Sequence, residues 1–162
     1  MSKAFSHENL ANGKDEWLTP QSILLRLDKF DLDPCAAVNQ PWRTAAVHYT
    51  IADDGLKKDW YGRVWLNPPY NQAKIWLAKL ATHGLGTALV YARVETRMFF
   101  DYVWDQANAI LFIKGRLTFL HADGQKPENT GGAPSCLIAY GRGDADILEL
   151  SGIAGKFIRL KG

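Results

Sequence analysis

The chain has 162 residues, enough for one domain, and its 47% hydrophobic and 22% charged residues are the balance of a globular protein. A net charge of +2 gives little support to nucleic-acid binding through a broad basic surface. The cysteines, Cys35 and Cys136, and the four histidines lack disulfide or metal-ligand spacing, so we expect reduced cysteines and no metal. Membrane-length apolar runs and a signal peptide are both missing from the sequence, so we expect a cytoplasmic protein without membrane contact.

The N-terminal part predicts an irregular arm followed by one helix. Residues 1–14 are polar and contain the turn signal Asn12-Gly13, so we expect them to be irregular. Thr19 is the predicted N-cap and Pro20 the first residue of a helix. Apolar residues at helical spacing then extend this helix to about Lys29.

The rest of the chain alternates predicted strands with predicted helices. Residues 31–33 form a short extended stretch that stops at a proline, and apolar, β-branched runs predict strands at 46–51, 63–66, 87–92 and 109–113. Helices are predicted at 73–82 and 95–106, a further pair of strands at 117–120 and 135–140, and no type for 147–160. This order predicts one α/β domain over 1–162, whose mostly parallel central sheet has antiparallel C-terminal strands and helices on both faces.

The strongest functional signal is the run Asn67-Pro68-Pro69-Tyr70, which directly follows a predicted buried strand. In open α/β sheets, ligands bind just beyond the carboxyl ends of strands. The two prolines lack backbone N–H groups and hold the chain extended, so the Pro68 carbonyl is free to accept a hydrogen bond in a cleft. The Asn67 side-chain oxygen is a second acceptor. A simple turn is the competing interpretation, because Asn-Pro and Pro-Pro are common in loops.

Two acceptors side by side suit methyl transfer to an amino nitrogen. The lone pair of an exocyclic amine is delocalised into its ring, which makes the nitrogen a poor nucleophile. Acceptors that bind both amine hydrogens favour a pyramidal nitrogen and stabilise the positive charge that develops there, so they act mainly in the transition state. Tyr70 is placed to stack on a base that has been swung out of its helix. We therefore predict a catalytic role for Asn67, Pro68, Pro69 and Tyr70.

From about residue 15 to 141, the chain resembles the small phage-encoded DNA N-6-adenine methyltransferases, which are class I, Rossmann-like enzymes. The resemblance depends on the order and spacing of six motifs: Asp15-Glu16-Trp17-Leu18-Thr19-Pro20, Asp33-Pro34-Cys35-Ala36, Asp53-Asp54-Gly55-Leu56 with Trp60, Asn67-Pro68-Pro69-Tyr70, Gly115-Arg116-Leu117-Thr118-Phe119 and Gly132-Ala133-Pro134-Ser135. It implies S-adenosylmethionine as cofactor, N6 of adenine in double-stranded DNA as substrate, and a bacterial host cell as location.

The resemblance also implies a set of cofactor-binding residues. Trp17, Thr19 and Pro20 match the segment that holds the methionine end of the cofactor. Asp33 and Pro34 match the end of the first core strand, where a carboxylate faces the cofactor's amino group. Asp54 matches an acidic position near the cofactor's adenine or ribose, although Asp-Gly also favours a plain turn.

One departure from the usual pattern concerns the loop after the first core strand. Many methyltransferases have a glycine-rich turn there, whereas this chain has Asp33-Pro34-Cys35-Ala36-Ala37. Small residues such as Cys35 take the place of glycine in this interpretation. Nucleic-acid contacts are predicted for Arg93, Arg97, Lys114 and Arg116, which follow predicted strands and are otherwise ordinary surface cations.

Three functions remain open at this stage. The leading one is methyl transfer to N6 of adenine in DNA. The same acceptor pair also suits a planar nitrogen in RNA or in a protein glutamine. A non-catalytic nucleic-acid-binding domain of the same fold is the third, favoured by the glycine-free loop and opposed by the intact Asn67–Tyr70 run.

Overall fold

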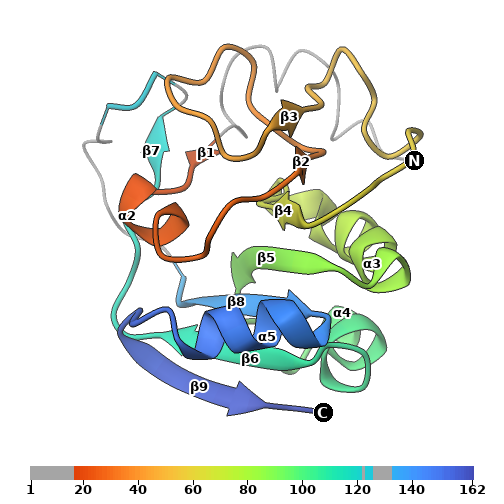
Figure 1. The fold of residues 1–162 in the computed structure, drawn as a ribbon, viewed down its shortest axis with the longest axis vertical. Coiled ribbons are helices and arrows are strands. Elements are labelled where there is room, and N and C mark those ends of the chain that lie inside the picture. Colours follow the sequence, from red (N-terminus) through yellow and green to blue (C-terminus); the bar gives the residue numbers. More distant parts are fainter. Residues whose placement is uncertain (1–16, 122, 126–132) are drawn as a thin grey trace.

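A computed structural model describes residues 17–121, 123–125 and 133–162, and the expected irregular arm lies outside these residues (Figure 1). Within them, a seven-stranded sheet has the order β3-β2-β4-β5-β8-β6-β9, and β1 and β7 form a separate two-stranded sheet. The strands of the large sheet are β2 (Leu32–Asp33), β3 (Val47–His48), β4 (Val64–Leu66), β5 (Gly86–Tyr91), β6 (Ala109–Ile113), β8 (Ser135–Tyr140) and β9 (Gly155–Arg159). The small sheet pairs β1 (Trp17–Leu18) with β7 (Leu120–His121).

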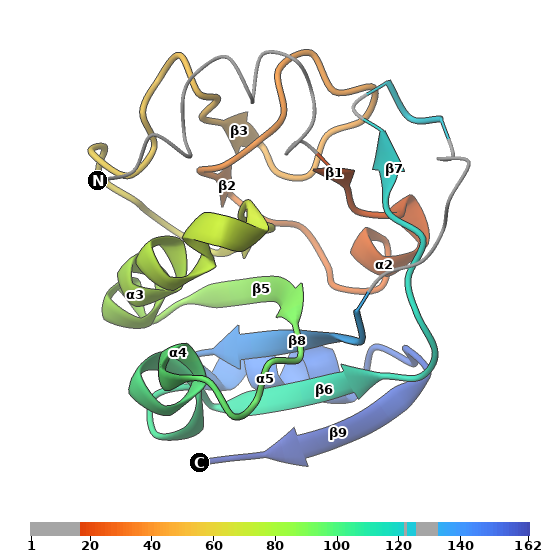
Figure 2. The ribbon, with the colours of Figure 1, turned by 180° about the vertical axis from the view of Figure 1, so that it is seen from behind.

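Most strands of the large sheet point in one direction. β3, β2, β4 and β5 are mutually parallel. β8 is antiparallel to both β5 and β6, so β6 points the same way as β5, while β9 is antiparallel to β6. Figure 2 shows β5 and β6 running toward the side where α2 (Gln21–Leu24), β1 and β7 lie. The predicted mixed sheet, mostly parallel with antiparallel C-terminal strands, is confirmed.

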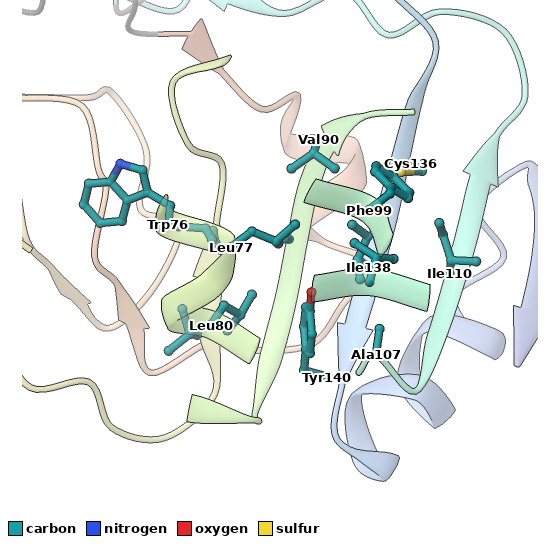
Figure 3. Close-up of a cluster of buried hydrophobic side chains, with 14 of the residues drawn as sticks. Trp76, Leu77, Leu80, Val90, Phe99, Ala107, Ile110, Cys136, Ile138 and Tyr140 are labelled. Atoms are coloured by element: carbon teal, nitrogen blue, oxygen red, sulfur yellow. The ribbon is translucent and has the colours of Figure 1, made fainter. Parts of the chain in front are cut away.

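Alternate residues of the strands pack into two cores, one on each face of the sheet. On one face, α3 (Ala73–His83), α4 (Arg97–Phe99) and the π-helical turn η3 (Phe100–Trp104) cover a core that includes Leu77 and Phe99 (Figure 3). On the other face, α5 (Arg142–Glu149) and the α2 region cover a core that includes Trp65 and Leu148. Helices therefore lie on both faces, as predicted.

The helix predicted from Thr19 to about Lys29 is wrong in its start and its length. α2 covers only Gln21–Leu24, with Pro20 as the N-cap residue and no side-chain cap. Thr19 does not cap because its buried hydroxyl accepts a hydrogen bond from Asn67 instead. The helix stops early because Arg63 takes the Leu27 and Lys29 carbonyls as acceptors, and Asp28 between them has a left-handed φ of 63°.

The other boundaries follow the predictions with three corrections. β6 matches the predicted strand, and α3 ends at Gly84, whose φ of 79° supplies the left-handed C-cap. The strand expected at 46–51 is reduced to β3, and the helix expected at 95–106 is divided into α4 and η3. Residues 117–120 do not pair with 135–140, because β8 inserts between β5 and β6 while β7 pairs with β1. The unassigned tail supplies the end of α5 and then β9.

An ion pair ties the amino end of the sheet together. The Arg63 guanidinium, just before β4, donates to both carboxylate oxygens of Asp144 at 2.9 and 3.0 Å, and Asp144 is only 1% exposed. The Thr87 hydroxyl also donates to this carboxylate, at 2.8 Å. Arg63 lies 4.2 Å from the centre of the Phe30 ring as well. One side chain therefore connects the α2 region, β4 and α5, and it does so at the edge opposite the carboxyl ends of the strands.

Candidate active site

Because β2, β4, β5 and β6 all run in the same direction, their carboxyl ends lie at one edge of the large sheet. These strands end at Asp33, Leu66, Tyr91 and Ile113, so the edge gathers several of the residues that the sequence singled out. Asn67 follows β4 without a break. Open α/β sheets bind their ligands at this kind of edge.

Asn67 is held by the segment that contains β1. Its side-chain nitrogen Nδ2 donates to the Trp17 carbonyl at 3.0 Å and contacts the Thr19 hydroxyl at 3.2 Å. Because both amide hydrogens are directed at these oxygens, Oδ1 points the other way as an acceptor. Pro68 and Pro69 are buried, and among the described residues nothing donates to the Pro68 carbonyl. The arrangement therefore offers two acceptors and no backbone donor at residues 68 and 69.

Tyr70 presents its ring at the surface of this edge. It is 59% exposed, and its ring centroid lies 5.1 Å from that of Tyr91 at the end of β5. The Tyr91 ring in turn makes an edge contact with Phe119 at 6.4 Å. The Arg93 guanidinium lies 5.8 Å from the Tyr70 ring centre. Aromatic and cationic groups together make a surface on which a flat ring can stack.

Tyr91 and Phe119 were missed by the sequence prediction. Tyr91 ends the predicted strand at 87–92, so its position at a carboxyl end was a usable signal. Phe119 belongs to the quoted Gly115–Phe119 motif, but nothing local indicates that its ring reaches Tyr91.

The predicted cofactor segment meets the predicted catalytic segment at Asn67. Trp17 is 40% exposed, and its ring stacks on His121 with centroids 5.1 Å apart. Leu18 and Thr19 are buried, at 3% and 2% exposure. Pairing of β1 with β7 therefore fixes the backbone of this segment beside Asn67.

Asp33 is a buried carboxylate at the end of β2, 3% exposed. One oxygen accepts from the Cys35 N–H at 3.0 Å and the other from the Thr44 hydroxyl. Burial raises the pKa of Asp33 to about 6, an effect that these two hydrogen bonds partly offset. Among the described residues it forms no ion pair, so its negative charge has no cationic partner there.

Thr44 links Asp33 to two further polar side chains that the sequence did not indicate. The Gln40 amide donates to its hydroxyl at 3.2 Å, and the Thr44 backbone N–H donates to His48 Nε2 at 3.2 Å. Nε2 is therefore an acceptor, which fits a neutral ring. Burial, and secondarily Arg43, lower the pKa of His48. This network fixes the Asp33 carboxylate, and only the folded chain brings its members together.

The loop after β2 contacts Gly55 closely. A Cβ atom at Gly55 would lie 2.0 Å from the Pro34 carbonyl oxygen, so only glycine fits without a shift of the backbone. The Gly55 carbonyl also accepts from the Trp60 indole at 2.8 Å. Gly55, from the Asp53–Leu56 motif, therefore allows the Asp33 loop to pack closely against this turn.

The remaining predicted residues are Asp54, Arg97, Lys114 and Arg116, all of them exposed. Asp54 has a φ of 56°, and its side chain is 53% exposed and pairs with Lys57 at 3.5 Å. Arg97 is 85% exposed and pairs with Asp101 at 3.6 Å. Lys114 and Arg116 are exposed in the chain after β6, on the same edge as Asn67. Of the predicted cations, Arg93 alone has a recorded contact with a predicted catalytic residue.

In the part of the chain that the structure describes, His, Cys, Asp and Glu form no group of three that could hold a metal ion. The helices of that part are also too short or too polar to cross a bilayer.

Comparison with known proteins points to one family. The family model described as DNA N-6-adenine-methyltransferase (Dam) matches residues 6–153. A curated relative named DNA N-6-adenine-methyltransferase, from Escherichia phage T1, is 34% identical over 115 residues, which are 65% of this chain and 47% of the relative. The chain therefore spans about half the length of the curated relative that it matches. No solved structure matches it.

Proposed function

Because this chain belongs to the DNA N-6-adenine-methyltransferase (Dam) family, we propose that it transfers a methyl group from S-adenosylmethionine to N6 of adenine in double-stranded DNA. The observation that carries this proposal is the state of Asn67. Its amide nitrogen binds Trp17 and Thr19, which leaves its oxygen directed away from them, and the next residue, Pro68, has a carbonyl that accepts no hydrogen bond from the described residues.

The two acceptors bind the amine that receives the methyl group. Asn67 Oδ1 and the Pro68 carbonyl oxygen each accept a hydrogen bond from one of the two amine hydrogens. These hydrogen bonds favour a nitrogen whose lone pair is no longer delocalised into the ring. Both hydrogen bonds become stronger as positive charge develops on the nitrogen, so they stabilise the transition state more than the ground state. Asn67 is neutral and does not act as a base, and the proton released after methyl transfer leaves to solvent.

The target adenine leaves the duplex to reach these acceptors, and Tyr70 stacks on it. The exposed Tyr70 ring, backed by Tyr91, supports this role. Arg93, Lys114 and Arg116 are placed to contact phosphates along the same edge, and Arg97 extends this surface.

The buried Asp33 carboxylate fits a cofactor that carries an ammonium group. A desolvated negative charge without a cationic partner in the described chain is stabilised by a bound cation. S-adenosylmethionine has such an ammonium and supplies an electrophilic methyl group when bound. Asp33 would hold the ammonium, with the backbone of Pro34 and Cys35 beside it, and Trp17 and Pro20 would contact the methionine end. Asp54 is assigned to the adenosine part on the family pattern alone.

The order of the strands supports a class I, Rossmann-like assignment. A parallel set ends at one edge, and a reversed strand, β8, lies between β5 and β6. In such folds the cofactor and the substrate both bind at the carboxyl edge.

The test is methyl transfer from labelled S-adenosylmethionine to unmethylated DNA, with RNA and ribosomal protein offered in parallel. N6-methyladenine is then measured by mass spectrometry. Asn67→Ala is expected to lower the rate by roughly 100-fold or more, as loss of a transition-state acceptor does. Asn71→Ala is the matched control, because Asn71 is exposed four residues away.

Each outcome has a meaning. Label in DNA that depends on Asn67 supports the proposal. Label only in RNA or protein assigns a different substrate to the same acceptors. No label with retained DNA binding means a non-catalytic domain, and equal activity of the Asn67→Ala variant removes Asn67 from the mechanism.

A further inference from the structure

The hydroxyl group of Thr19 lies inside the protein and faces the side chain of Asn67. Thr19 is 2% exposed, and its Oγ1 is 3.2 Å from Asn67 Nδ2. The Trp17 carbonyl binds the same nitrogen at 3.0 Å. Two oxygens from one short segment thus converge on a residue that is almost fifty positions later in the chain.

These contacts decide which end of the Asn67 amide meets the substrate. A carbonyl can only accept, so the Trp17 carbonyl requires the NH2 end of the amide. If the amide were rotated by half a turn, Oδ1 would face the Trp17 carbonyl, and two acceptors would repel each other. The NH2 group would then point at the substrate amine, and because it is a donor it could not accept the amine hydrogens. The Thr19 hydroxyl adds a second acceptor on the correct side.

We propose that Thr19 is a positioning residue for the methyl-transfer site: its hydroxyl, with the Trp17 carbonyl, holds the Asn67 amide so that Oδ1 faces the amine. This inference rests on the proposed function and assigns Thr19 a task other than contact with the cofactor. Thr19 acts on the reaction only through Asn67.

The surrounding structure keeps this pair of acceptors in place. Leu18, between them in sequence, is buried at 3% exposure. The backbone is fixed by pairing of Trp17 with His121 and of Leu18 with Leu120, and the Trp17 ring stacks on His121. Pro20 then starts α2 and restricts the chain on the other side. The acceptors are therefore preorganised before any substrate arrives.

The experiment compares Thr19→Val with Thr19→Ser. Valine keeps the shape of threonine but removes the hydroxyl, and serine keeps the hydroxyl. We expect Thr19→Val to lower kcat for methyl transfer by about five- to tenfold, the effect of one hydrogen bond. KM for DNA and Kd for S-adenosylmethionine should change less than about twofold, because the lost hydrogen bond acts on the transition state and not on the binding of either ligand. Thr19→Ser should restore kcat. Thr82→Val is the control, because the Thr82 hydroxyl contacts only the Ala78 carbonyl on α3.

A second measurement does not depend on activity. The side-chain amide protons of Asn67 are assigned by NMR from their loss in Asn67→Ala, and their exchange with water is measured. Both should exchange slowly in the wild type and in Thr19→Ser, and at least one should exchange faster in Thr19→Val or Thr19→Ala. If the wild type methylates no substrate, the proposed function fails and the inference with it, whereas the exchange pattern still shows whether Thr19 holds the Asn67 amide.

Three results would overturn the inference. One is unchanged kcat and unchanged amide exchange in Thr19→Val. Another is a raised Kd for S-adenosylmethionine with kcat intact, which would make Thr19 a cofactor ligand. The third is a loss of kcat in Thr19→Val that Thr19→Ser does not restore, which would indicate a packing role. If Thr19→Val does not fold, Thr19→Ala and Thr19→Ser carry the same comparison.

Discussion

Replacing Asp33 by asparagine should change how the stability of the protein depends on pH. Burial raises the pKa of this carboxyl from 3.8 to about 6 in the folded chain. Well below pH 4 the carboxyl is protonated in both the folded and the unfolded state, and well above pH 6 it is ionised in both. Between these values the unfolded state loses its proton first, so the folded state becomes less stable as pH rises. A shift of about two pKa units corresponds to about 3 kcal/mol.

Urea unfolding of the wild type and of Asp33→Asn at several pH values measures this effect. The free energy of unfolding of the variant, minus that of the wild type, should rise by about 2 kcal/mol from pH 4 to pH 7, because the unfolded carboxyl is already partly ionised at pH 4. Asp59→Asn is the control, because Asp59 is exposed and should give a nearly flat difference. A flat difference for Asp33→Asn as well would refute the argument that this carboxylate is buried without a compensating charge.

The same carboxylate makes a prediction about the cofactor. If Asp33 holds the ammonium of S-adenosylmethionine, the ionised form binds best, so affinity should fall as pH drops below about 6. Calorimetric titration at pH 5 and pH 7 measures this change. Asp33→Asn should bind weakly at both values, and a variant that binds as tightly as the wild type at pH 7 would separate Asp33 from the cofactor.

Two further substitutions test the frame and the surface of the site. Arg63→Ala should lower the free energy of unfolding by about 3–5 kcal/mol, because it leaves the Asp144 carboxylate buried without its partner. Urea unfolding measures this loss, and Arg159→Ala, which removes ion pairs at the surface, is the comparison that should lose less. Equal losses in the two variants would contradict the prediction. Tyr70→Ala should weaken binding to DNA that contains an unpaired adenine by about 1–3 kcal/mol, while Tyr70→Phe keeps the stacking ring. Fluorescence anisotropy with a labelled oligonucleotide checks this, and identical affinities of the two variants would argue against stacking.

The sequence predicted the elements whose signals are local. β6 is an apolar run with clear ends, β4 stops at two prolines, and α3 stops where Gly84 adopts a left-handed φ of 79°. The direction of the strands followed from the alternation with helices. Local patterns failed where a distant partner competes: Arg63 binds the carbonyls that would continue α2, and Asn67 takes the Thr19 hydroxyl that would cap it.

The site divides in the same way. The sequence pointed to Asn67, Pro68, Pro69 and Tyr70 because an apolar strand followed directly by this run is recognisable from local sequence. Their catalytic role stays a prediction. Tyr91, Thr44 and Gly55 belong to the same edge but depend on contacts between separate segments. Their short stretches of sequence look like ordinary strand, loop and turn, so no local pattern predicts these contacts.

The reversed direction of β8 has a consequence for where the chain can accept additional residues. β6 ends at the edge that holds Asn67, and β8 starts there, paired through Phe112 and Cys136. β6 and β8 are therefore joined by a connection that leaves and rejoins the sheet at the same edge. The entropy of closing such a connection grows only slowly with its length. Insertions in it should cost the fold little, while the strands that lead to Asn67 keep their register.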